Sequence, residues 1–280
     1  MPTFPVAGPV PVELDLPFGD LHVIAGDRTD VVVTVEPADP TRSGSVRAAE
    51  DTRVERRGDT IEIVYPHSWK QYVLPFAAGG ARVTIELPAG SRVSGKAGAM
   101  FAEGRLGVVD ISLSAGDARI DEAARVVVKA AAGAVVVGRV TESLSVRASA
   151  GSVRVAELTG DGSVRTSAGT THVGSVDGSL AVTGSHGDIT VGVLRGTVTA
   201  KAASSGIRVE RIESGVTHLT TSYGSIEVGV PEGTAAWLDV GAQHGTVRNQ
   251  LDAAQGPVEG DRTAEVHAST GYGDVVIRRP

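Results

Sequence analysis

The amino-acid sequence predicts an all-β protein, namely a single-stranded β-helix (β-solenoid) with parallel rungs and coils of about eighteen residues. Three observations support this prediction. Small residues recur at a nearly constant spacing, apolar residues recur at fixed distances from them, and apolar and polar residues alternate within each copy. Alternation with a period of two indicates strands, because successive side chains face opposite sides. No segment sustains a helical period, so we expect no helix.

The repeat is clearest between residues 91 and 230. A small residue anchors each copy, and successive anchors lie 17 to 19 positions apart: Gly98, Gly116, Gly133, Gly151, Gly169, Gly187, Ser205 and Gly224. The position four residues after the anchor is apolar in nearly every copy: Ala102, Ile120, Val137, Val155, Val173, Val191, Val209 and Val228. Looser copies follow at Gly245 and Gly273, where this position is Asn249 and Ile277.

Equivalent residues of successive coils should stack about 4.8 Å apart, so the apolar positions predict buried ladders. We expect two short strands in each coil, separated by a glycine corner. Three short faces and a flatter, two-sided cross-section both fit a coil of this length.

Residues 1–90 are less regular, and five segments separated by Pro and Gly are interpreted as strands: 12–16, 21–24, 31–35, 60–64 and 81–87. We interpret residues 1–90 as an N-terminal β cap with irregular coils, and residues 91–280 as the regular repeats. Residues 250–262 are a polar insertion. The coil after it, which ends in Gly271-Tyr272-Gly273-Asp274-Val275-Val276-Ile277, is expected to cap the C-terminal end.

Composition narrows the functional classes. The net charge of −7 and the pI near 5.5 argue against specific nucleic-acid binding. The absence of cysteine excludes disulfides and thiolate metal sites. No apolar run is long enough to span a membrane, and the N-terminus does not have the pattern of a signal peptide. We therefore expect a cytoplasmic protein, which could associate with a membrane only through a partner.

Three motifs stand out: Phe18-Gly19-Asp20-Leu21-His22-Val23, Thr220-Thr221-Ser222-Tyr223-Gly224-Ser225-Ile226-Glu227-Val228, and the repeated Leu-x-Val-x-x-Ser-x-Gly-x-Val-x-Val. With these motifs the chain resembles the DUF4097 family of adhesin-like proteins, also called toastrack. The likeness covers most of the chain. It implies a β-solenoid with an adhesin-like or interaction role, and it carries no catalytic residues.

Motifs for enzymatic chemistry are absent. The sequence has no G-x-S-x-G elbow, H-E-x-x-H helix, calcium loop or complete G-x-G-x-x-G fingerprint. The seven histidines do not show the spacing of zinc ligands. We therefore expect no catalytic residues, no cofactor and no metal, and a β-helix carbohydrate-active enzyme is the least favoured alternative.

Two columns of outward residues are candidate binding surfaces. Four positions before the anchor, basic residues recur at Lys129, Arg147, Arg165 and Lys201, with Thr183 among them. Such a basic stripe is either a solvated face or a groove for an anionic polymer or an acidic partner. Directly before the anchor, alanine gives way to rings at His186, Tyr223, His244 and Tyr272, with Ser204 after His186. This corner stack is either structural or a ligand-binding strip.

A third candidate is an aromatic cluster at Tyr65, Trp69, Tyr72 and Phe76, with Pro66 and Pro75 adjoining its two end residues. It either covers an open end of the core or binds a partner or a second copy of the chain.

The favoured function is a non-enzymatic binding or scaffolding β-solenoid, adhesin-like, that presents a rigid surface to a protein or an anionic polymer. The rival is a cytoskeletal scaffold that polymerises through its strand edges, as bactofilin-like solenoids do.

Overall fold

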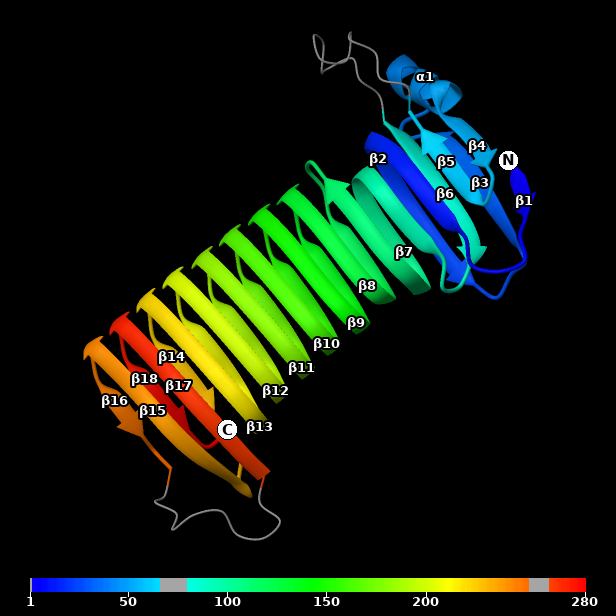
Figure 1. The fold of residues 1–280 in the computed structure, drawn as a ribbon. Helices are drawn as coiled ribbons and strands as arrows, with labels where there is room; N and C mark the ends of the chain where they lie inside the picture. Colours follow the sequence, from blue (N-terminus) through cyan, green and yellow to red (C-terminus); the bar gives the residue numbers. More distant parts are fainter. Residues whose placement is uncertain (1, 66–79, 252–261) are drawn as a thin grey trace. The chain divides into compact units, whose positions relative to one another are not determined.

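The computed structural model describes residues 2–65, 80–251 and 262–280. The chain forms two compact units, Met1–Gly138 and Arg139–Pro280, and the boundary falls within strand β9 (Val135–Ala150). Each unit is built mainly from parallel strands (Figure 1). The predicted β-solenoid is confirmed. The predicted boundary at residue 90 stays a prediction.

In the first unit, β2 (Pro11–Gly26) is the first coil. One side of β2 pairs in parallel with β7 (Arg92–Leu113), which in turn pairs with β8 (Ala118–Ala132). The other side pairs in parallel with β5 (Thr60–Val64) and β6 (Ala81–Pro88). The buried rows of these strands are apolar, as period-two alternation predicts.

Antiparallel strands flank the parallel strands of this unit. Strand β3 (Asp30–Pro37) pairs with β6, β4 (Arg53–Arg57) pairs with β5, and β1 (Thr3–Pro5) pairs with β3. All five strand segments predicted in residues 1–90 lie within these strands.

The expectation of no helix is wrong, because Ser43–Asp51 form helix α1, which contacts β3 and β6. The helix buries only Ser45 and Ala48, so its sequence carries too little apolar periodicity to predict it.

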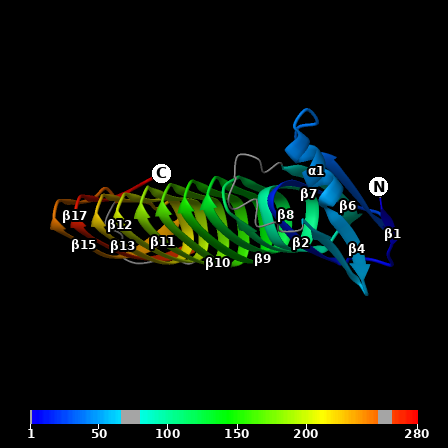
Figure 2. The same ribbon diagram turned by 90° about the horizontal axis from the view of Figure 1, so that it is seen from above.

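The second unit repeats one coil several times. Strands β10 (Val153–Ala168), β11 (Thr171–His186), β12 (Ile189–Ser204) and β13 (Ile207–Tyr223) pair in parallel, each with the next. They lie side by side in both views (Figure 1, Figure 2). The predicted ladder of valines is confirmed, since residues 155, 173, 191 and 209 are in register and fully buried.

Each coil from β10 to β13 is one long bent strand instead of the two short strands that we expected. The strand continues through a second glycine in the middle of the coil, at Gly160, Gly178, Gly196 or Gly215. At Gly196 the φ angle is 134°, and an added Cβ would lie 2.1 Å from the carbonyl oxygen of Gly178. Only glycine fits this bend, because other residues avoid positive φ and carry the clashing carbon.

The C-terminal coils are not stacked in sequence order. Strands β13 and β14 (Ile226–Gly229) pair with β17 (Arg262–Tyr272) and β18 (Val275–Arg278). These two then pair with β15 (Thr234–His244) and β16 (Val247–Asn249), which lie outermost (Figure 1).

The expectation that the last coil in sequence would cap this end is therefore wrong. Burial explains the order, because Ile277 is fully buried in the inner coil, whereas its register partner Asn249 meets solvent in the outer one.

Candidate functional site

The candidate site is the outward side of three neighbouring strands of the second unit, β13, β17 and β15, where aromatic rings and polar side chains lie together. We call this surface the C-terminal face. The register aligns Thr220 with Ser269, and Ser269 with Gly241. Residues two positions apart on one strand point to the same side. The outward residues therefore form columns that run across the three strands, with members about 4.8 Å apart.

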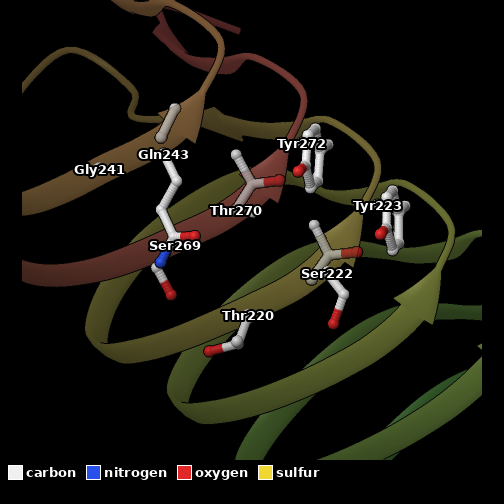
Figure 3. A pocket seen from close by; sticks show the side chains of 11 residues that line it. Thr220, Ser222, Tyr223, Gly241, Gln243, Ser269, Thr270 and Tyr272 are labelled. Atoms are coloured by element: carbon white, nitrogen blue, oxygen red, sulfur yellow. The ribbon is translucent and has the colours of Figure 1, made fainter.

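The first column is a stack of rings at the corner where each strand ends. The rings of Tyr223 and Tyr272 are parallel, with centroids 4.9 Å apart, and the ring of His244 stacks on the other side of Tyr272 at 4.5 Å. Tyr223 and Tyr272 are 58% and 50% exposed. Because the neighbours cover the faces of Tyr272, this column presents mainly ring edges and hydroxyl groups (Figure 3).

Three of the four residues predicted for the corner stack therefore meet. The fourth, His186, is in register with Ser204, and Ser204 is in register with Tyr223. A serine thus separates His186 from the rings.

Next to the ring stack lies an open groove of about 540 Å³ (Figure 3). None of the residues that line it is charged. Exposed hydroxyl and amide groups come from Thr220, Ser222, Ser269 and Gln243, whereas Thr221 and Thr270 are buried and donate their hydroxyls inward to backbone carbonyl oxygens. The remaining lining residues are Tyr223, Tyr272, Gly241, Ala242 and Gly271. A Cβ added at Gly241 would meet no atom within 4 Å, so the glycine leaves open space there. Hydroxyl and amide groups both donate and accept hydrogen bonds, so the groove suits a ligand rich in the same groups.

A second group of rings, the histidine cluster, lies on the other side of the groove columns. His218 and His267 stack with centroids 4.6 Å apart, and Trp237 meets His267 edge-on at 5.1 Å. His267 contacts two carboxylates, Glu265 at 2.7 Å through Nε2 and Asp239 at 3.3 Å through Nδ1. The hydrogen bond to Glu265, helped by the bond to Asp239, raises the pKa of His267 despite partial desolvation.

Sequence reasoning missed this cluster, although a signal was present. His218 lies six residues before Gly224 (224 − 218 = 6), and His267 lies six residues before Gly273 (273 − 267 = 6). The common offset from the anchor places both in one column. A constant step of eighteen residues does not predict this column. The reason is that β17 pairs directly with β13, although other strands lie between the two in the sequence.

The predicted basic stripe is only partly assembled. Arg165 is in register with Thr183, and Thr183 with Lys201, so a threonine separates the two basic residues by two rungs, or about 10 Å. Both basic side chains are exposed, and neither has an ion pair among the described residues. Lys129 on β8 and Arg147 on β9 are also exposed. The stripe as a binding site stays a prediction.

Of the predicted aromatic cluster, only Tyr65 belongs to the described residues. It follows β5, donates its backbone N–H to the carbonyl oxygen of Asp15 at 3.0 Å, and lines a small cavity with Phe18 and Ala48. Trp69, Tyr72 and Phe76 lie outside the described residues.

In the described part of the chain, no three His, Asp or Glu side chains are arranged to hold a metal ion. No helix in the same residues is long and apolar enough to cross a bilayer.

Comparison with known proteins gives a clear family. Among solved structures, the chain is similar to a "putative adhesin" from Bacteroides fragilis NCTC 9343, with 13% identity and a TM-score of 0.35 over 100% of this chain and 95% of that one. It is also similar to a "putative cell adhesion protein" from Clostridium sporogenes ATCC 15579, with 11% identity and a TM-score of 0.27 over 100% and 98%. No curated protein matches the chain.

The sequence profile of the family described as Toastrack DUF4097 matches residues 13–278. The resemblance seen in the motifs is therefore confirmed, and the chain belongs to the Toastrack DUF4097 family.

Proposed function

We propose that this adhesin-like β-solenoid is a non-enzymatic binding protein whose C-terminal face recognises a polar, uncharged chain molecule such as a neutral polysaccharide. One observation carries the proposal: ring stacks lie on both sides of an open groove lined by hydroxyl and amide groups. Convergent polar groups beside aromatic side chains are the usual makeup of a site for a polar ligand.

The chemistry of the lining favours an uncharged ligand. None of the residues that line the groove is Lys, Arg, Asp or Glu. Thr220, Ser269 and Gln243 offer both donors and acceptors, and such groups match the hydroxyls of a sugar without needing to neutralise charge.

The geometry favours a chain over a small molecule. The groove is open to solvent, and its column of polar side chains continues beyond it, because Lys201 is in register with Thr220, and Thr183 with Lys201, on the neighbouring coils. A ligand that lies across the coils therefore meets a polar side chain about every 4.8 Å. The ladder of backbone hydrogen bonds fixes these positions before binding, which lowers the ordering cost.

An anionic polymer is the second candidate, because exposed Lys201 adjoins Thr220 and has no ion pair among the described residues. Binding that depends on Lys201 and Arg165 would weaken strongly as salt is raised. Binding through hydroxyl and amide groups would not.

The test is a panel of neutral and uronic-acid polysaccharides, measured by microarray and titration calorimetry. The Ser269→Ala/Gln243→Ala double variant should bind a neutral polysaccharide about tenfold or more weakly, since each lost hydrogen bond contributes about 1 kcal/mol. Thr159→Ala is the matched control, because it removes an exposed hydroxyl of β10 that belongs to another column and does not line the groove. It should leave affinity unchanged.

Three results would overturn the proposal. The first is that no neutral polysaccharide binds, and the second is that the double variant binds as tightly as the natural chain. The third is salt-sensitive binding that disappears in Arg165→Ala/Lys201→Ala, which would assign the anionic ligand instead.

A further inference from the structure

Among the described residues, the outermost coil of the second unit, β15 with β16, does not close the end of the stack with a polar surface. Terminal repeats of solenoids usually turn a polar surface to solvent. Here the inward residues of β15 that follow the buried Thr234 are apolar: Ala236, Leu238, Val240 and Ala242. Of the inward positions of this coil, only Asn249 on β16 has an amide.

Among the residues that the structure describes, these inward side chains lack the cover that their neighbours have. Leu238 and Val240 are half-buried, whereas their register partners Val266 and Ala268 are 0% and 3% exposed. Val247 is 40% exposed, and its partner Val275 is fully buried. One more coil in the same register would complete the burial, since buried apolar surface is worth about 25 cal/mol per Å².

The outer edge of β15 is also open to backbone pairing. Among the residues that the structure describes, β15 pairs only with β17. Natural edge strands are commonly blocked by proline, lysine or an inward-pointing charge. Strand β15 has no proline, no lysine or arginine and no inward charge, and its one carboxylate, Asp239, points outward.

The antiparallel end of the first unit is protected in the ways that β15 is not. Strand β1 ends at Pro5, which has no backbone N–H to donate. Strand β4 has four charged residues in five, with sequence Arg-Val-Glu-Arg-Arg. Helix α1 packs against β3 and β6. This end is therefore a poor template for a further strand.

We propose that the occupant of the β15 edge is the β15 edge of a second copy of the chain, paired antiparallel about a twofold axis. The end of a second solenoid coil has the cross-section to cover Leu238, Val240 and Val247 while supplying backbone partners along the strand. The protected end of the first unit does not offer this surface. The contact is therefore isologous, and assembly stops at two copies.

The register of this pairing is constrained by charge. Two copies of Asp239 directly opposite each other would repel, so the strands pair in a register that separates them. The end of a single coil is small compared with the roughly 1,600 Å² of a standard interface. We expect a weak dimer that forms at micromolar or higher concentration.

The first experiment is sedimentation equilibrium over a concentration series, with each variant's fold checked by circular dichroism. The natural chain should move from monomer to dimer and no further. Leu238→Lys and Val247→Lys each place a charge on the apolar end and should remain monomeric. Val136→Lys is the matched control, since it changes an exposed valine on β9, and it should dimerise normally. If Leu238→Lys does not fold, Val247→Lys decides.

The second experiment uses the absence of cysteine, which makes a single introduced thiol unambiguous. A Cβ has open space at both Gly241 and Gly8. Nitroxide labels on Gly241→Cys should show a short distance between copies, and labels on Gly8→Cys should not. The proposal fails if the chain stays monomeric, if assemblies exceed two copies, if folded Val247→Lys still dimerises, or if Gly8 labels approach each other.

Discussion

The ring of Tyr272 stacks on that of Tyr223 with the two planes within 4° of parallel, although all of β14, β15 and β16 separates the two residues in the chain. The contact exists because the last coil of the sequence inserts beside β13, so that the tyrosines that end β13 and β17 come into register. His244 then stacks on the far side of Tyr272, at the end of the outermost coil. The order of coils thus creates the corner stack.

The position of Tyr272 between two rings predicts unequal effects of removing each tyrosine. Tyr272→Ala loses two stacked contacts and Tyr223→Ala loses one, and each pair is worth about 0.5–1.5 kcal/mol beyond buried area. We expect the free energy of unfolding in urea to fall by about 1–2 kcal/mol for Tyr272→Ala and by roughly half that for Tyr223→Ala. His186→Ala, which removes a ring outside the stack, is the control. Equal losses for all three variants would contradict the stack.

The order of the C-terminal coils predicts opposite tolerances at the register partners Ile277 and Asn249. Ile277→Asn places an amide in a fully buried apolar position and should cost about 3 kcal/mol or more. Asn249→Ile changes an exposed residue and should shift stability by less than about 0.5 kcal/mol. Chemical denaturation of the two variants measures both values. A mild effect at Ile277 would mean that β18 lies at the end of the stack.

The bend within each coil predicts that Gly196 cannot carry a side chain. Gly196→Ala requires a residue with positive φ and a Cβ 2.1 Å from the carbonyl oxygen of Gly178, so we expect a loss of about 2 kcal/mol or more. Gly206→Ala is the matched control, because its Cβ would make only ordinary contacts. It should be neutral or stabilising by up to about 1 kcal/mol. Thermal melts that rank the two variants the other way would exclude the bend.

The histidine cluster predicts a pH effect with a defined sign. Glu265 and Asp239 hold the pKa of His267 above its ordinary value of 6.5, while His218 stacks on the ring and Trp237 meets it edge-on. A raised pKa in the folded state means that the stabilisation is complete below pH 6.5 and is lost as pH rises through the folded-state pKa. The imidazole resonances of His267 in an NMR titration should therefore have a midpoint above 6.5.

Variants distinguish the effects of the two carboxylates on the pKa of His267. Glu265→Gln should lower the pKa of His267 more than Asp239→Asn does, because the hydrogen bond to Glu265 is the largest cause of the shift. A midpoint that is unchanged in Glu265→Gln would show that this hydrogen bond does not control the titration.

Much of the repeat could be predicted from the sequence. Val155, Val173, Val191 and Val209 were assigned to one buried ladder, and they form it. The prediction works because a constant spacing along the chain equals one circuit of the coil, so a local pattern specifies a contact between coils. The strands of residues 1–90 were found for a similar reason, since alternation within a strand is local.

The candidate site was predicted only in part. Tyr223, His244 and Tyr272 were placed in one column by their position before an anchor, but their stacking order was not. His218 and His267 were not predicted to meet. Helix α1 was not predicted either, because it buries Ala48 as its one apolar residue and has no long apolar pattern. In each case the deciding contact joins segments that no fixed spacing connects.

The sequence alone determined that the chain coils, which residues face the interior, and where most coils turn, because these follow from short-range periodicity and the conformational freedom of glycine. The tertiary structure decided that β17 and β18 lie between β13 and β15. A parallel rung makes the same backbone hydrogen bonds with any neighbouring coil, so pairing does not select the order. Burial selects the order of the coils, because Ile277 is buried among apolar residues within the stack, whereas the amide of Asn249 remains hydrated at its end.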